Sequence, residues 1–259
     1  MKFAICTSIS NAAAVKAAGW EYVEENVQTL LQPAVPDGQW SDGPAKSAVL
    51  PIPAANVLMP AALKITGPTA DPQKLRHHLT TVIRRARKVG IRTIVFGSGA
   101  ARNVPDGFDR KTAVQQITDF AASAAQLAAE HGITIVAEHL NRGECNIMNT
   151  VAEAMEYVKA VNHPNFQCLV DTYHLWLEDE PLENVRAAMP WIKHVHLADK
   201  DGRVAPGLSG TSDYRKFFGV LKKANYNGLI SFEGTAMPDF AVTAPKVLAY
   251  LKDQWTNSL

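Results

Sequence analysis

Short apolar runs alternate with patterns of helical spacing along this chain. Eight runs are predicted as strands: Lys2–Cys6, Tyr22–Val27, Leu63–Thr66, Thr93–Phe96, Ile133–Ala137, Phe166–Val170, Ile192–Leu197 and Leu229–Phe232. Strands that alternate with helices indicate a parallel sheet. Eight repeats in 259 residues favour a single (β/α)8 TIM barrel over an open doubly wound sheet. The prediction is one α/β domain over residues 1–259.

Helix boundaries are marked by residues that typically begin and end helices. Asp71 followed by Pro72 predicts a helix start, with a capping side chain and a proline in the first turn. Gly90 predicts the end of that helix, and apolar residues lie at helical spacing in between. Thr150 and Glu153 form a capping-box pattern that opens another helix. The helix after the second strand has the weakest signal.

One stretch interrupts the alternation. From about Gln32 to Pro60 the chain is rich in proline and glycine, with Trp40 inside it. A loop of this length is unusual in a compact domain, and such loops often serve as lids or binding loops. We therefore predict a lid-like loop over about residues 32–60.

Composition narrows the classes of partner. The formal net charge is +1, so nothing in the overall balance favours nucleic acid or an anionic membrane. The basic run Arg84–Lys88 is interpreted as the solvated side of a helix. No apolar stretch is long enough to span a bilayer. The start of the chain does not resemble a secretory signal. Cys6, Cys145 and Cys168 show no CxxC spacing, so we expect free thiols and a cytoplasmic protein.

Four predicted strands each end in a side chain that can bind a metal ion. These side chains are Glu138, Asp171, His196 and Glu233. Each of them taken singly is better explained as a helix cap, a salt-bridge partner or a core histidine. Strand ends of a parallel barrel meet at one mouth, however, so the four groups are expected to converge. Carboxylates with one imidazole suit one divalent ion, with Mn²⁺ as the first candidate and Mg²⁺, Co²⁺ or Zn²⁺ as others.

Several segments from about Ala61 onward resemble the D-tagatose 3-epimerase group of the xylose-isomerase-like superfamily. The segment Glu138–Glu144 resembles the E-x-L-N-R-x-E motif of that group. The other matching segments are Asp171–His174 (D-x-x-H), His196–Asp199 with Arg203 and Pro206-Gly207, and Phe232–Gly234 in the final strand.

The resemblance implies roles for individual residues. It implies that Glu138, Asp171, His196 and Glu233 bind one metal ion, and that Glu138 and Glu233 form the acid/base pair. It also implies that the side chains which hold substrate oxygens are Glu144, His174 and Arg203. Arg203 lies one residue further from His196 than expected for ketohexose epimerases. A homo-oligomer, either a dimer or a tetramer, is implied in the same way.

This residue set suits proton transfer beside a carbonyl group. A divalent ion can stabilise the enediolate that forms when the proton leaves, and two carboxylates can exchange the proton. Return of the proton on the other face gives an epimer, and transfer between adjacent carbons gives an aldose–ketose isomer. The leading hypothesis is therefore a divalent-metal-dependent epimerase or isomerase acting on a ketose or related keto-sugar.

Other functions stay open. Hydroxypyruvate isomerases and inosose dehydratases share the superfamily and the metal. Apurinic-site endonucleases share the barrel but use three zinc ions. The predicted third and fourth strands lack the histidines that those enzymes use, and Ser209–Thr211 stands where an Asp-x-His is expected. A non-catalytic sugar-binding barrel is disfavoured by the presence of both Glu138 and Glu233.

Two further residues near strand ends are candidates for lesser roles. Glu24, in the second strand, is a candidate for substrate contact or for helix capping. His194 shares the inward face of its strand with His196, because strand side chains alternate. We expect His194 to be a buried, hydrogen-bonded core residue.

Overall fold

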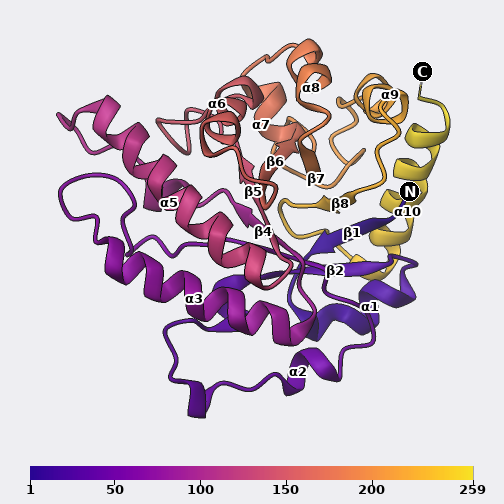
Figure 1. Cartoon of the computed structure of the whole chain (residues 1–259). Helices are drawn as coiled ribbons and strands as arrows, with labels where there is room; N and C mark the ends of the chain where they lie inside the picture. The colour runs from indigo at the N-terminus through magenta and orange to yellow at the C-terminus, as the bar shows by residue number, and fades with distance from the viewer. Residues whose placement is uncertain (259) are drawn as a thin grey trace.

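The computed structural model describes residues 1–258 and is a closed barrel of eight parallel strands in sequence order, with β1 paired to β8 (Figure 1). The strands are β1 Phe3–Cys6, β2 Tyr22–Asn26, β3 Ala54–Asn56, β4 Thr93–Phe96, β5 Thr134–Glu138, β6 Phe166–Asp171, β7 Ile192–Leu197 and β8 Leu229–Phe232. The predicted single (β/α)8 barrel is confirmed.

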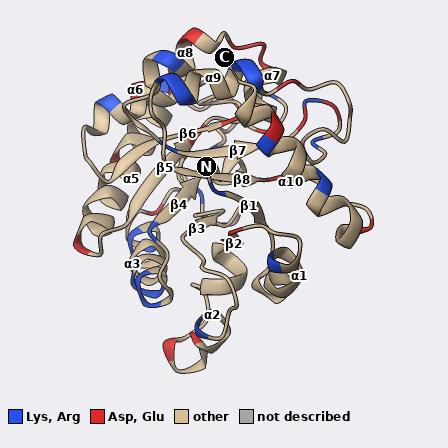
Figure 2. Ribbon diagram, turned by 90° about the vertical axis from the view of Figure 1, so that its right-hand side faces the viewer, with Lys and Arg blue, Asp and Glu red and all other residues tan. Residues whose placement is uncertain are grey.

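Helices surround the ring of strands (Figure 2). They are α1 Ala12–Ala17, α2 Gly43–Lys46, α3 Pro72–Val89, α4 Gly99–Arg102, α5 Arg110–Glu130, α6 Val151–Val161, α7 Thr172–Leu177, α8 Leu182–Ala188, α9 Arg215–Lys223 and α10 Phe240–Thr256. Short turns of other helix types are η1 Ile9–Asn11, η2 Val27–Leu31 and η3 Asp37–Gln39. Within residues 1–258, none of the helices combines the length and apolar character that a membrane span requires.

The helix caps predicted from the sequence form. Asp71 accepts hydrogen bonds from the backbone N–H groups of Gln73 and Lys74, and Gly90 ends α3 with a positive φ of 90°. Thr150 accepts a hydrogen bond from the backbone N–H of Glu153. These are local interactions between residues close in sequence, which is why the sequence predicts them.

The third strand was predicted in the wrong place. Leu63–Thr66 is an irregular segment with bends, whereas β3 is Ala54–Asn56, inside the stretch predicted as a loop. Its residues have low β propensity, but Ala54 pairs with Glu24 of β2 on one side and with Thr93 of β4 on the other. Pairing on both sides therefore makes this segment a strand. The long connection after β2 ends before β3 rather than at residue 60.

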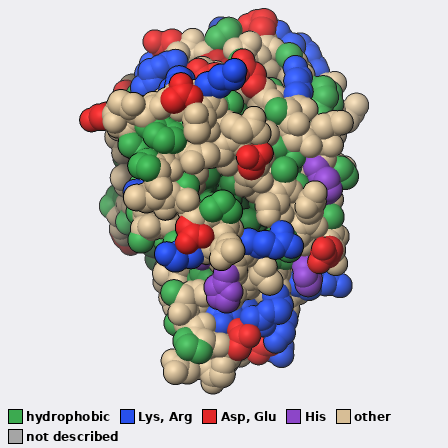
Figure 3. Space-filling model, turned by 60° about the vertical axis from the view of Figure 1, so that its left-hand side comes forward, with side chains coloured by type: hydrophobic (Ala, Val, Ile, Leu, Met, Phe, Trp, Pro, Cys, Tyr) green, Lys and Arg blue, Asp and Glu red, His purple; other side chains and the backbone are tan. Residues whose placement is uncertain are grey.

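The basic run on α3 is also not simply a solvated face. The Arg85 side chain is 1% exposed and donates hydrogen bonds to the carbonyl groups of Leu31, Gln32 and Val35. Arg87 and Lys88 are exposed. Lys and Arg residues are dense on α3 (Figure 2), and Figure 3 shows basic side chains with histidines low on the face in view. Arg85 thus attaches the connection after β2 to the barrel.

Side chains alternate between the two faces of the barrel wall. Outward residues such as Ile94 and Ile135 belong to the hydrophobic layer beneath the helices. Inside the barrel, Val95, Val136 and Leu169 form a separate apolar cluster. Inward residues at the ends of β5, β6 and β7 are ionisable and buried, namely Glu138, Asp171 and His196, and the buried Glu24 and His194 lie before the ends of β2 and β7. The alternation therefore places a layer of ionisable groups at the carboxyl ends of the strands.

Candidate active site

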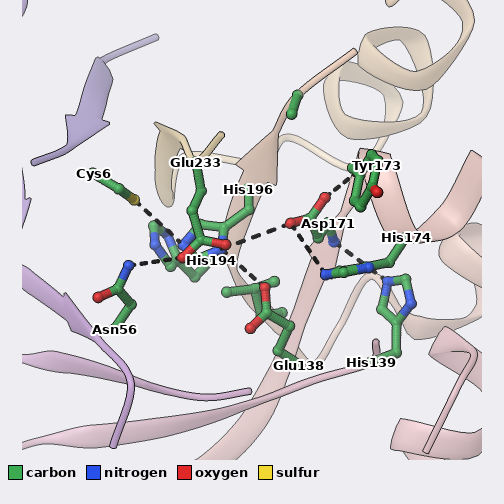
Figure 4. A network of polar contacts seen from close by, with 12 residues as sticks. Cys6, Asn56, Glu138, His139, Asp171, Tyr173, His174, His194, His196 and Glu233 are labelled. Atoms are coloured by element: carbon green, nitrogen blue, oxygen red, sulfur yellow. Dashed lines mark hydrogen bonds and ion pairs between the residues drawn. The ribbon is translucent and has the colours of Figure 1, made fainter. Parts of the chain in front are cut away.

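The four predicted ligands come together at the mouth of the barrel (Figure 4). One ligand atom from each of Glu138, Asp171, His196 and Glu233 lies within 4.8 Å of the others. The Nδ1 atom of His196 is 3.0 Å from Glu138 Oε1, 3.5 Å from Glu233 Oε2 and 4.0 Å from Asp171 Oδ2. The ends of β5 to β8 supply one group each, because neighbouring parallel strands end at the same edge.

The donor set fits a divalent cation. Asp171 is fully buried, and its Oδ2 atom has no hydrogen-bond partner although it lies beside the other acids. A buried carboxylate oxygen without a partner costs free energy, which a bound cation would offset. Three carboxylates and one imidazole match the ligands of Mn²⁺, Mg²⁺, Co²⁺ or Zn²⁺. These four residues could therefore hold one such ion.

Arg203 connects Glu233, one of the four predicted ligands, to Glu144. Its Nη2 atom donates to Glu233 Oε2 at 2.7 Å and lies 3.8 Å from Asp171 Oδ2. Its Nη1 atom donates to Glu144 Oε1 at 3.3 Å. The structure thus brings Arg203 and Glu144, both predicted as substrate ligands, together beside the cluster.

His174, the third predicted substrate ligand, lies in α7 and is fully buried. The helix begins there because Asp171 accepts a hydrogen bond from the backbone N–H of Tyr173. His174 Nδ1 is 2.8 Å from the Asn141 side-chain nitrogen, and His174 Nε2 is unpartnered, 3.9 Å from Asp171 Oδ2.

Electrostatics separates the two predicted acid/base residues. Burial, with the charge of Glu233, raises the pKa of Glu138 above its ordinary value. Burial would also raise the pKa of Glu233, but His196 and then Arg203 lower it to about 2. Two carboxyl groups with pKa values moved apart are suited to act as acid and base. Burial is the main cause that raises the pKa of Asp171 to about 6, and the charge of Glu233 acts in the same direction.

A cavity of about 560 Å³ opens onto this cluster. Glu138, Glu233, Glu144 and Arg203 line it on one side. The remaining walls come from the ends of β3 and β4, from α4 and from the segments after β5 and β8, and include Asn56, Val57, Met59, Ala61, Gly97–Ala101, Leu140, Gly234 and Thr235. The cavity size is typical of small-molecule sites.

The sequence did not indicate two side chains that hold the acids in place. Asn56 donates to Glu233 Oε1 at 2.7 Å, and this residue was overlooked because β3 was misplaced. Arg102 is fully buried and donates to the backbone carbonyls of Phe96 and Glu138. No local pattern marks Arg102, since its partners lie on two different strands.

The two candidates for lesser roles have different outcomes. His194 is buried and hydrogen-bonded, as predicted, with Nδ1 3.1 Å from the Leu229 carbonyl oxygen. Glu24 is fully buried, and both of its carboxylate oxygens face histidines rather than a helix N-terminus. Glu24 therefore does not cap a helix.

Sequence comparison finds sugar epimerases. The chain is 33% identical over 149 residues to the L-ribulose 3-epimerase of Methylomonas sp. (strain DH-1), covering 56% of this chain and 48% of the relative. It is 33% identical over 127 residues to the 3-dehydro-D-guloside 4-epimerase of Escherichia coli (strain K12), covering 49% and 46%. Both matches span about half of the relative's length. A putative hydroxypyruvate isomerase of Mus musculus is 26% identical, covering 70% and 65%.

Structure comparison extends the match to almost the whole chain. The D-allulose 3-epimerase of Methylomonas sp. superposes with a TM-score of 0.84 at 24% identity, covering 98% of each chain. The family model described as "Xylose isomerase-like TIM barrel" matches residues 12–254. The chain belongs to the xylose isomerase-like TIM barrel family.

Proposed function

We propose that this protein is a divalent-metal-dependent epimerase or isomerase of ketoses or related keto-sugars. The observation that carries the proposal is the pair Glu138 and Glu233, which line one cavity and both face His196 Nδ1. The epimerase names of the relatives support the same class of reaction.

Each residue has a part in the proposed reaction. Glu138 and Glu233 both line the cavity, where one would remove a proton from the carbon beside the carbonyl group and the other would return it. Arg203 and Glu144 line the cavity beside them and would hold substrate oxygens. His174, whose Nε2 atom has no hydrogen-bond partner, would also hold a substrate oxygen. A divalent ion held by Glu138, Asp171, His196 and Glu233 would stabilise negative charge on the carbonyl oxygen.

The charges around the cavity favour a sugar without a phosphate group. Among its lining residues Arg203 is the one with a cationic side chain, and Glu233 and Glu144 already engage it. A phosphate usually requires unengaged Lys or Arg side chains, or a cluster of backbone N–H groups. We therefore propose a neutral keto-sugar as the substrate.

Related functions have less support. Hydroxypyruvate isomerase is the second candidate, because one of the relatives is so named. An inosose dehydratase would use the same metal site but lacks a named relative among these matches. Strands β3 and β4 contain no histidine, which disfavours a three-zinc endonuclease. The presence of both Glu138 and Glu233 in the cavity lining disfavours a barrel that only binds sugars.

Proton exchange in D₂O tests the proposal. Metal-loaded protein is incubated with a panel of ketoses and ketose phosphates, and NMR follows deuterium entry and new sugars. We expect deuterium at a carbon beside the carbonyl of a neutral ketose, with an epimer or isomer as product. No exchange on any sugar by protein with a bound ion would overturn the proposal.

Two substitutions assign the chemistry to the carboxylates. Glu138→Gln and Glu233→Gln should each lower kcat by roughly 10²- to 10⁴-fold, because each removes one proton-transfer group. Glu183→Gln, at an exposed pair with Arg186, is the control and should retain activity. Circular dichroism checks the fold of each variant. Near-normal activity in the double variant would end the two-carboxylate mechanism.

A further inference from the structure

A buried carboxylate lies behind the proposed metal ligands and takes no part in the reaction described above. Glu24 projects from β2 into the barrel interior and has no exposed surface. We infer that Glu24 is a positioning residue, which holds His196 in the tautomer that binds the ion through Nδ1. The inference rests on the proposed metal centre.

The contacts of Glu24 connect two histidines of β7. Its Oε1 atom lies 3.0 Å from His196 Nε2, and its Oε2 atom lies 2.7 Å from His194 Nε2. The two imidazole rings are in edge contact, with centroids 4.8 Å apart (Figure 4). Strands β2 and β7 are not neighbours in the barrel, so these contacts cross its interior.

The chemistry of the imidazole ring sets the tautomer. A neutral histidine has one N–H group and one lone pair, and an ionised carboxylate can only accept a hydrogen bond. His196 Nε2 must therefore carry the proton that Glu24 accepts. With an ion bound, the lone pair would be on Nδ1, the atom that faces Glu138, Asp171 and Glu233. A carboxylate behind a metal-binding histidine commonly fixes the ring in this way.

His194 holds the second oxygen of Glu24 in place. Its Nε2 atom lies 2.7 Å from Glu24 Oε2, so the carboxylate is fixed between the two imidazole rings. The far side of the His194 ring also has a neighbour, because its Nδ1 lies 3.1 Å from the Leu229 carbonyl oxygen. The contacts thus run in a chain from the Leu229 carbonyl group through His194 and Glu24 to His196.

Cys6 does not compete for the same nitrogen. Its Sγ atom lies 4.0 Å from His196 Nε2, at the limit of a weak contact, whereas Glu24 Oε1 lies at 3.0 Å. Although Cys6, Glu24 and His196 lie close together, Glu24 Oε1 is the atom within normal hydrogen-bond distance of His196 Nε2.

Metal affinity gives the first test. Calorimetry measures the Kd for Mn²⁺ of metal-free wild-type protein, of Glu24→Gln and of the control Tyr22→Phe. Tyr22 lies two residues earlier on the same strand face and contacts Ser231, not His196. We expect Glu24→Gln to weaken binding by roughly 10- to 100-fold, and Tyr22→Phe to change it little. An unchanged Kd in Glu24→Gln would overturn the inference.

Nitrogen NMR of the histidine rings gives a second test that does not depend on a variant. In Zn²⁺-loaded wild-type protein we expect His196 to carry its proton on Nε2. A proton on Nδ1 would overturn the inference even if Glu24→Gln does not fold. A folded Glu24→Gln protein should show a changed His196 signal, whereas a merely structural Glu24 would leave the tautomer as in wild type.

The two proposals can fail separately. Wild-type protein that binds Mn²⁺ tightly and Glu24→Gln weakly, with no exchange on any sugar, would support the inference and overturn the proposed function. A wild type that catalyses exchange, together with a Glu24→Gln variant whose Kd for Mn²⁺ is unchanged, would support the proposed function and overturn the inference. A wild type that binds none of Mn²⁺, Mg²⁺, Co²⁺ and Zn²⁺ would overturn both.

Discussion

At the scale of single residues, the site depends on charges held where a protein interior does not normally tolerate them. Glu138, Asp171 and His196 are each less than 5% exposed. Each has opposite charges nearby, yet Asp171 keeps an oxygen without a hydrogen-bond partner. Such strongly perturbed groups in a cavity are typical of functional sites.

The absence of a side chain at Gly97 leaves space for the Glu138 carboxylate. Gly97 follows β4, and a Cβ atom at this position would collide with Glu138 Oε2. Gly97→Ala should therefore displace the carboxylate and lower kcat roughly 10²-fold, since misplacement by about 1 Å can have that effect. Steady-state kinetics measures the change.

A second glycine provides the control. A Cβ atom at Gly38 would meet no atom within 4 Å, so Gly38→Ala should keep wild-type activity. Equal activity of the two variants would show that the Glu138 carboxylate does not need its present position. Thermal unfolding of both variants separates an active-site effect from a loss of stability.

At the scale of elements, the connection after β2 is held to the barrel by a charged side chain rather than by a regular hydrophobic face. This segment has little regular structure, but Arg85 of α3 binds three of its carbonyl groups and also Asp37 at 2.8 Å. The Trp40 ring packs against the same guanidinium group at 4.8 Å. These contacts come from α3, far along the chain, so no local pattern announces them.

The Asp37 contacts predict a pH-dependent contribution to stability. Hydrogen bonds from Arg84 and then Arg85 lower the pKa of Asp37 from 3.8 to about 2. A carboxyl group with a lowered pKa in the folded state stabilises the protein above pH 3.8, and this contribution is lost as pH falls towards about 2. Asp37→Asn should lower Tm at pH 7, with a smaller difference at about pH 3.

Thermal unfolding at the two pH values measures this effect. Asp106→Asn is the matched control, because Asp106 is exposed and forms no ion pair within residues 1–258. A Tm difference for Asp37→Asn that stays constant down to about pH 3 would contradict the linkage argument.

At the scale of the whole molecule, the proposed ion should stabilise the barrel. Its four ligands come from β5, β6, β7 and the end of β8, which lie in different parts of the sequence. Mn²⁺ at about 100 times its Kd should add about 2.7 kcal/mol to the free energy of unfolding. That corresponds to a rise in Tm of roughly 5–10 °C for a chain of this size.

Differential scanning calorimetry with and without a chelator measures this rise. His196→Ala removes one ligand, so it should lower the bound metal content and largely abolish the rise. Full metal content in His196→Ala would remove this residue from the proposed ligand set. Homo-oligomer formation and a cytoplasmic location stay predictions, which light scattering and cell fractionation can test.

Some parts of this protein follow from sequence alone. Seven of the eight strands lie where their apolar runs predicted them, because each run is bounded by turn or cap residues. The four acidic or imidazole groups at strand ends were also predicted, since parallel strands must end at one mouth. These features depend on local pattern and on the topology that the pattern implies.

Other parts were decided only by the tertiary structure. The segment Ala54–Asn56 is a strand because β2 and β4 pair with it, not because of its own residues. The histidine partners of Glu24 lie far away in sequence, on β7, and Arg102 reaches the Glu138 carbonyl on β5. The sequence determined which groups reach the barrel mouth. The closed barrel decided which residues these groups contact. Residues that meet across its interior are far apart in sequence, so no pattern of local spacing predicts the contact.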